Sequence, residues 1–85
     1  MRLDNKTNEL IAIGASVTAN CQPCLQYHVN KALEFGADEE EVAAAIETGK
    51  TVRKGATAKM DAFASTISKT ASSHAGAPAG GCGCS

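Results

Sequence analysis

Apolar side chains recur every three or four positions in the first segment of the chain, where Leu10, Ile13 and Val17 share this spacing. Such a period places them on one face of a helix. Asp4 or Asn5 stands just before the segment, and both residue types are favoured N-caps because their side chains accept a hydrogen bond from an unpaired backbone N–H. We therefore predict a first helix here.

A second helix is expected to begin near Pro23, since a first-turn proline lacks only an N–H that has no helical partner. Leu25, Val29 and Ala32 then share one face of this helix. Gly36 stands where the helix should end, because glycine readily adopts the left-handed conformation of a C′ residue.

A third helical region opens with Asp38 and Glu41, which have the spacing of a capping box. Apolar or small residues then continue at steps of three or four, at Val42, Ile46, Gly49, Val52, Ala56, Met60, Phe63 and Ile67. Gly55 leaves open whether this region is one helix or two. No segment shows the apolar–polar alternation of a strand, so we predict an all-α fold, a helical hairpin followed by one or two further helices.

The composition changes after Lys69, where "TASSHAGAPAGGCGCS" is small, polar and rich in glycine. Such a stretch has too few apolar side chains to offset the entropy of ordering it. We therefore predict a helical domain over residues 1–69 and a flexible tail over residues 70–85, which carries Cys82 and Cys84 near its end.

The hydrophobic fraction of 44% is largely alanine, and the chain has one tyrosine, two phenylalanines and no tryptophan. Alanine-rich helices in an 85-residue chain bury little apolar surface. We expect self-association to supply the missing burial.

The net charge of −1 and the lack of a basic tract give no reason to expect nucleic acid as a partner. No apolar run resembles a signal peptide or approaches the roughly 20 residues of a membrane span. We expect a cytoplasmic protein with no membrane partner, and in that compartment cysteines are more often catalytic or metal-binding than structural.

The stretch "CQPCLQYH", residues 21–28, carries the candidate chemistry. Cys24 and His28 are four residues apart, so on a helix they lie one turn apart on the same face, where the imidazole is placed to accept the thiol proton. Cys21 stands at the helix start, and unpaired N–H groups and the positive end of the helix dipole favour a thiolate there. The spacing favours thiol redox chemistry and predicts that Cys21 lies at the exposed start of the helix.

Other readings remain open on spacing alone. The two motif cysteines and His28 supply three zinc ligands, and Cys82 and Cys84 are candidates to complete such a site. His28 is also compatible with a structural hydrogen bond, and Cys24 with a small buried apolar residue. A c-type haem site is excluded because Leu25, not histidine, follows the second cysteine.

The cysteine motif with its histidine, and the following "YHVNKALEFGADEEEVAAAIE", resemble the alkylhydroperoxidase D-like branch of the carboxymuconolactone decarboxylase family over approximately residues 8–65. The resemblance implies a small all-α fold that assembles into trimers or hexamers. In that branch a glutamate lies twelve residues before the first cysteine, and Glu9 occupies this place. Taken alone, Glu9 is typical of a solvated helix carboxylate. The family's decarboxylase branch lacks these cysteines, so their presence counts against decarboxylation.

The resemblance also implies roles. Cys24 would attack a peroxide, Cys21 would resolve the sulfenic acid into a disulfide, and His28 and Glu9 would form a proton relay. The implied activity is thiol-dependent reduction of peroxides or protein disulfides, without a cofactor, and with a protein or low-molecular-weight thiol as reductant. Pro23 replaces a histidine of the prototype, a departure that leaves general dithiol–disulfide exchange intact.

Two further features have alternative interpretations. Cys82 and Cys84 could serve as a shuttle that reduces the motif disulfide, by analogy with the C-terminal arms of some flavin disulfide reductases, or as metal ligands. A metal-binding protein that uses all four cysteines is thus the alternative function. Lys50, Arg53, Lys54 and Lys59 give the third helical region a basic side, which is typical of a solvated face and also suits an acidic reductant.

Overall fold

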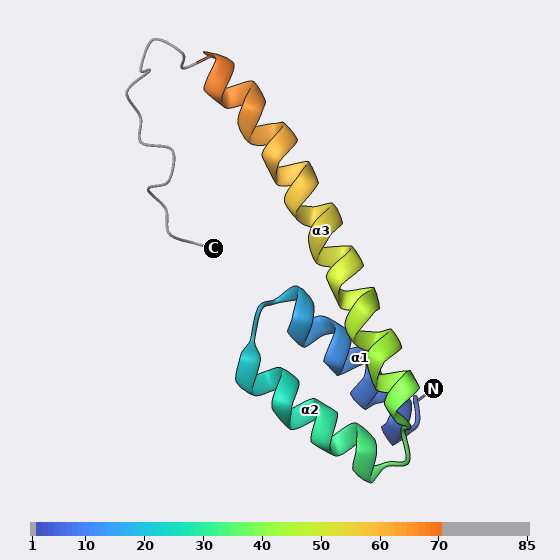
Figure 1. The fold of residues 1–85 in the computed structure, drawn as a ribbon. Helices are drawn as coiled ribbons and strands as arrows, with labels where there is room; N and C mark the ends of the chain where they lie inside the picture. Colours follow the sequence, from blue (N-terminus) through green and yellow to red (C-terminus); the bar gives the residue numbers. More distant parts are fainter. Residues whose placement is uncertain (1, 71–85) are drawn as a thin grey trace.

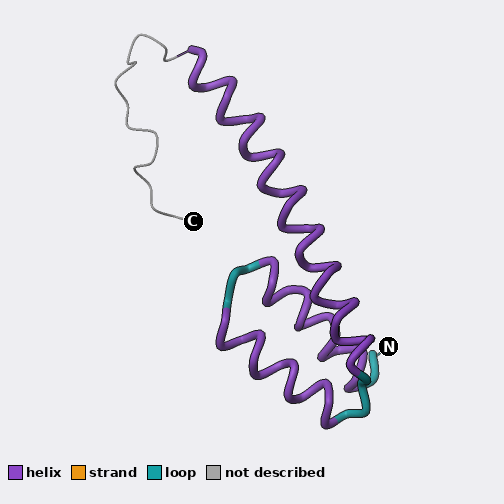
Figure 2. Tube along the Cα trace, in the orientation of Figure 1, coloured by secondary structure: helices purple, strands orange, loops and turns teal. Residues whose placement is uncertain are grey.

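The computed structural model describes residues 2–70 and consists there of three helices, α1 (Asn5–Thr18), α2 (Gln22–Glu34) and α3 (Glu39–Thr70). The helices α1 and α2 form an antiparallel hairpin, and the first part of α3 packs against α1 (Figure 1). The rest of α3 extends away from the hairpin (Figure 1). Within the described residues there is no strand (Figure 2), so the all-α prediction is confirmed. The third region is one helix that runs through Gly55.

The helix ends follow from local chemistry. Asp4 caps α1, because its Oδ1 accepts a hydrogen bond of 2.7 Å from the backbone N–H of Thr7. Gly36 has φ of 98° in the turn after α2, a conformation that costs glycine little. At the start of α3 the capping box is present: the Glu41 N–H donates to Asp38 Oδ1 at 2.8 Å, and the Asp38 N–H donates to Glu41 Oε1 at 3.0 Å.

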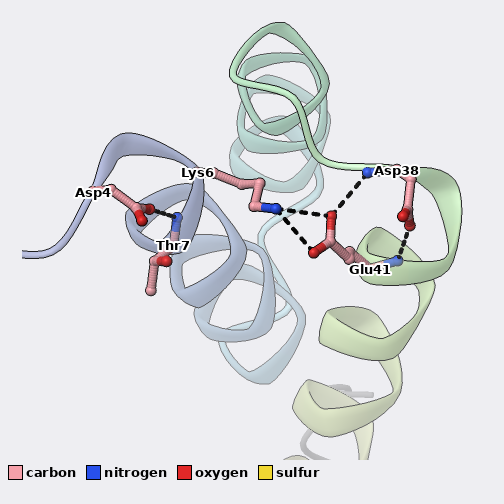
Figure 3. A network of polar contacts seen from close by, with 5 residues as sticks. All are labelled: Asp4, Lys6, Thr7, Asp38 and Glu41. Atoms are coloured by element: carbon pink, nitrogen blue, oxygen red, sulfur yellow. Dashed lines mark hydrogen bonds and ion pairs between the residues drawn. The ribbon is translucent and has the colours of Figure 1, made fainter.

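An ion pair joins this capping box to the first helix (Figure 3). Lys6 Nζ of α1 donates to Glu41 Oε2 at 3.0 Å and to Oε1 at 3.3 Å. Glu41 therefore serves both the start of α3 and the contact between α3 and α1. Lys6 lies at the start of α1, so this contact holds the end of the hairpin that is opposite the turn between α1 and α2.

The core between the three helices is small. Its buried apolar residues are Ile13, Ala32, Ala37 and Val42, and the partly buried residues packed against them are Leu10, Leu25, Val29, Ala45 and Ile46. Among the large side chains that the structure describes, only Ile13 is fully buried. Large apolar side chains on the extended part of α3 are instead exposed, with 63% of Met60 and 61% of Phe63 accessible. Across residues 2–70, each helix is too short or too polar to cross a membrane.

Candidate functional site

The two motif cysteines are joined as a disulfide at the start of α2. Their Cα atoms are 5.3 Å apart, within the usual range for a bridge. The chain reaches α2 through Asn20, whose φ of 58° is a left-handed conformation that asparagine tolerates. Cys21 is the N-cap of α2, and its N–H donates to the Ser16 carbonyl at 3.0 Å. This bond holds the start of α2 against the end of α1.

The position of Cys21 is predicted correctly, but its exposure is not. Cys21 is the N-cap of α2, at the start of the helix as the sequence predicts. It is half-buried rather than exposed, whereas Cys24 is exposed. The reason is the tight turn after α1, which places Cys21 against the last turn of that helix. The alternative in which Cys24 is a buried apolar residue is also wrong.

Glu9 and His28 lie in direct contact across the hairpin. Glu9 Oε1 of α1 is 2.6 Å from His28 Nδ1 of α2, and the side chains are 19% and 28% exposed. The antiparallel packing of the two helices brings these positions together. A carboxylate only accepts hydrogen bonds, so Nδ1 carries the hydrogen and Nε2 is the unprotonated nitrogen of the neutral ring. The Tyr27 ring meets the imidazole edge-on, with ring centroids 5.0 Å apart.

A pocket of ≈ 240 Å³ opens beside Cys21. Leu25 and Ile46 contribute apolar surface to it, and Lys50 and Arg53 contribute positive charge. The sequence does not predict this pocket. The only signal for it is the basic side of α3, which is equally typical of a solvated surface.

Arg53 has a second connection in this region. Its Nη1 donates to the Val17 carbonyl at 3.2 Å and to Asn20 Oδ1 at 2.9 Å. Val17 O, in the last turn of α1, also accepts a hydrogen bond of 3.1 Å from the Asn20 N–H. Arg53 therefore fixes the turn that precedes Cys21 as well as lining the pocket.

The remaining predicted site residues, Cys82 and Cys84, lie outside the described residues. Within residues 2–70 no three histidine, cysteine, aspartate or glutamate side chains cluster in a way that could hold a metal ion. A metal site built from all four cysteines would have to include the tail.

The fold and the site therefore define a class of protein: small helical proteins with a dithiol motif and a histidine–carboxylate pair. Residues 2–67 match the carboxymuconolactone decarboxylase family, and the chain belongs to this family. It is 35% identical over 54 residues to "Uncharacterized protein 4 in cox locus" of Paracoccus denitrificans, a match that covers 64% of this chain and 49% of that protein. The chain therefore spans about half the length of this curated relative. No solved structure matches the chain significantly.

Proposed function

We propose that the protein is a thiol-dependent oxidoreductase of the alkylhydroperoxidase D-like branch, which reduces peroxides or protein disulfides through Cys21 and Cys24. The observation that carries this proposal is the 2.6 Å contact between Glu9 of α1 and His28 of α2. His28 lies on the helix that also bears the redox motif. A helix position four residues from Cys24 gives the imidazole access to the reacting thiol. The family membership supports the same assignment, since the cysteine-bearing branch carries these four residue types.

The first half-reaction consumes the peroxide. The thiolate of Cys24 attacks one peroxide oxygen, the S–O bond forms, the O–O bond breaks, and the leaving oxygen takes a proton to become an alcohol or water. Cys24 is then a sulfenic acid. The thiolate of Cys21 attacks the Cys24 sulfur, the S–S bond forms and the S–O bond breaks. The departing hydroxide takes the proton that the Cys21 thiol lost and becomes water. The exposed position of Cys24 supports its role as the attacking thiol.

Proton movement is assigned to His28. Its Nε2 takes the proton from Cys24 and returns it to the leaving oxygen, a role that typically accelerates a reaction by about 10²- to 10⁴-fold. Glu9 accepts the hydrogen bond from Nδ1–H, which fixes the orientation of the ring and leaves Nε2 as the nitrogen that can accept a proton. Glu9 is in this proposal a positioning residue.

The second half-reaction restores the dithiol. A thiol reductant, either a protein or a small molecule, attacks the disulfide and supplies two electrons. When the reduced dithiol instead attacks a disulfide of another protein, the same chemistry runs in the opposite direction. A cytoplasmic location, where such reductants maintain thiols, belongs to the same proposal.

We further propose that the functional form is a homo-oligomer, a trimer or hexamer. The support is the apolar side of α3 formed by Val52, Met60 and Phe63, each more than half exposed in the single chain. Alanine-rich helices leave the core small, and burial of this side against a second copy would add the missing apolar contact.

The test of the redox function uses protein in which Cys82 and Cys84 are changed to serine, so that only the motif thiols react. The protein is reduced, freed of reductant, and mixed with hydrogen peroxide or an organic hydroperoxide in a stopped-flow instrument. We expect the loss of both motif thiols and a rate well above that of a free cysteine at the same pH. A rate equal to that of free cysteine, together with failure to reduce a disulfide substrate, would refute the proposal.

A further inference from the structure

The pocket beside Cys21 combines three features that no other part of the proposed mechanism uses. Val17, Leu25 and Ile46 form its apolar surface, and Lys50 and Arg53 bring two positive charges. Among residues 2–70, no carboxylate lines it, and Cys21 is the one cysteine that does. Cys24, although more exposed, does not line this pocket.

We propose that this pocket binds a small thiol that carries a carboxylate and directs its sulfur onto Cys21. The inference rests on the proposed function and names the class of reductant for the second half-reaction. A volume of ≈ 240 Å³ accommodates a short hydrocarbon chain with a thiol and a carboxylate. The apolar residues contact the chain, and the two cations attract the carboxylate.

The availability of the two cations differs. Arg53 Nη1 donates to Val17 O and Asn20 Oδ1, and these contacts hold the guanidinium at the edge of the pocket that it lines. A guanidinium has five N–H donors, so the contacts through Nη1 leave further donors for a carboxylate. Lys50 pairs with Glu47 at 3.1 Å, but both side chains are more than half exposed. Such exposed pairs are weak, so a bound carboxylate competes with Glu47 for Lys50.

The reaction at Cys21 is thiol–disulfide exchange. The thiolate of the small molecule attacks the Cys21 sulfur, a mixed disulfide forms there, and the bond to Cys24 breaks. Cys24 leaves as a thiolate and takes up the proton that the small thiol lost when it ionised. A second thiol molecule attacks the sulfur of the first, the small-molecule disulfide departs, and Cys21 is released as a thiol. Two electrons pass from two thiols to one protein disulfide.

The test compares three probes of similar size and different charge: 3-mercaptopropionate, 2-mercaptoethanol and cysteamine. The full-length protein carries serine in place of Cys82 and Cys84, and its motif disulfide is formed beforehand with diamide, so that the test does not depend on peroxide reactivity. The variants are Lys50→Gln and, as a matched control, Lys54→Gln, since Lys54 is an exposed lysine of the same helix that does not line the pocket. The second-order rate of disulfide reduction is measured by acid quench and mass spectrometry. For each probe the rate with a variant is divided by the rate with the parent protein, which cancels the intrinsic reactivity of the thiol.

We expect Lys50→Gln to slow reduction by 3-mercaptopropionate about fivefold, the effect of one charge pair at close range in high dielectric. The 2-mercaptoethanol rate should stay unchanged and the cysteamine rate should stay unchanged or rise. Lys54→Gln should alter none of them. The quenched intermediate should carry mercaptopropionate on Cys21. Equal ratios for the three probes, equal effects of Lys50→Gln and Lys54→Gln, or a mixed disulfide on Cys24 would each overturn the pocket assignment. The peroxide reaction could still proceed in that case, and a protein reductant would then be indicated.

Discussion

Gly49 of α3 lies against the backbone of Gly14 of α1, so close that a Cβ atom on Gly49 would stand 2.6 Å from the Gly14 carbonyl oxygen. The same Cβ would be 2.9 Å from Cβ of Val17. Thr18 Oγ1 lies 2.9 Å from the Gly14 carbonyl oxygen and 3.2 Å from the Gly49 carbonyl oxygen, so its hydroxyl hydrogen is shared between the two helices at this crossing. Because α1 carries Glu9 and ends at the turn before Cys21, this crossing positions α3 relative to both parts of the site.

Gly49→Ala is therefore expected to destabilise the protein. The added methyl meets a backbone atom that cannot move aside, which typically costs about 1–3 kcal/mol and outweighs the gain of up to about 1 kcal/mol from alanine's higher helix propensity. Gly55→Ala is the matched control, because nothing lies within 4 Å of its Cβ position. This control should be stabilised by up to about 1 kcal/mol. Urea unfolding followed by circular dichroism, at one protein concentration, gives both values, and a stabilised Gly49→Ala would contradict the close crossing.

The helices and their ends could be predicted from the sequence because their signals are local. Asp38 and Glu41 form the capping box that their spacing predicts, and Gly36 ends α2 with a positive φ. The crossing of α1 and α3 could not be predicted. Gly14 and Gly49 indicate that another helix can pack closely at these positions, but a glycine in a helix does not identify that other helix.

A pH-dependent contribution to stability is expected from Glu41. The Asp38 N–H and then Lys6 hold the pKa of this carboxyl below its ordinary value of 4.5. A lowered pKa in the folded state means that the contribution is present above about pH 4.5 and is lost as the pH falls through the lower folded value. Glu41→Gln should thus reduce the free energy of unfolding at pH 7, and the difference from the parent protein should shrink by pH 3.

The measurement is urea unfolding of the oxidised protein at both pH values, with Glu40→Gln as control, since Glu40 is an exposed neighbour on the same helix turn. Glu40→Gln should change stability much less than Glu41→Gln at pH 7. A Glu41→Gln deficit that is the same size at pH 3 would show that the side chain acts through packing rather than charge.

Self-association should depend on the apolar side of α3. Phe63→Glu places a charge on this side and is expected to convert oligomers into monomers, because a buried unpaired carboxylate is strongly disfavoured at an interface. Ala58→Glu is the control: it lies on the opposite side of the same exposed stretch of helix. Sedimentation equilibrium at micromolar concentration distinguishes the species. A folded monomer of the unmodified protein, or dissociation by both variants alike, would contradict the proposed interface.

The candidate site could be predicted only in part from the sequence. The spacing of Cys21, Cys24 and His28 indicates dithiol chemistry because all three stand on one helix. Glu9 stands on another helix, so without a family resemblance it is indistinguishable from a solvated carboxylate. The exposure of the cysteines depends on the left-handed turn at Asn20 and its contact with Arg53, which no local pattern encodes.

The Glu9–His28 pair yields a prediction about the peroxide reaction. His28→Ala removes the group assigned to proton transfer and should slow oxidation of Cys24 by about a hundredfold near neutral pH. It should also shift the reaction to higher pH, where the thiol ionises without help. Glu9→Gln keeps the shape of the side chain but not its charge, and should slow the reaction less.

Glu34→Gln is the control for Glu9→Gln, since Glu34 is an exposed carboxylate of α2 that pairs with Lys31 at 3.5 Å. Stopped-flow rates across a pH series separate a shifted profile from a uniform loss. A uniform loss at every pH in Glu9→Gln would assign this residue to folding, not to the relay.

The division of labour between the motif cysteines gives the final prediction. Cys24 is exposed and one helical turn from His28, so Cys24 should be the thiol that attacks peroxide. In Cys21→Ser the sulfenic acid lacks its resolving partner and should accumulate after one fast reaction. In Cys24→Ser the fast reaction should be lost. Stopped-flow oxidation with a sulfenic-acid trap, in protein with serine at positions 82 and 84, tests both. If Cys24→Ser oxidises as fast as the parent protein while Cys21→Ser is inert, the roles are reversed, and the start of the α2 dipole at Cys21 governs the site in place of His28.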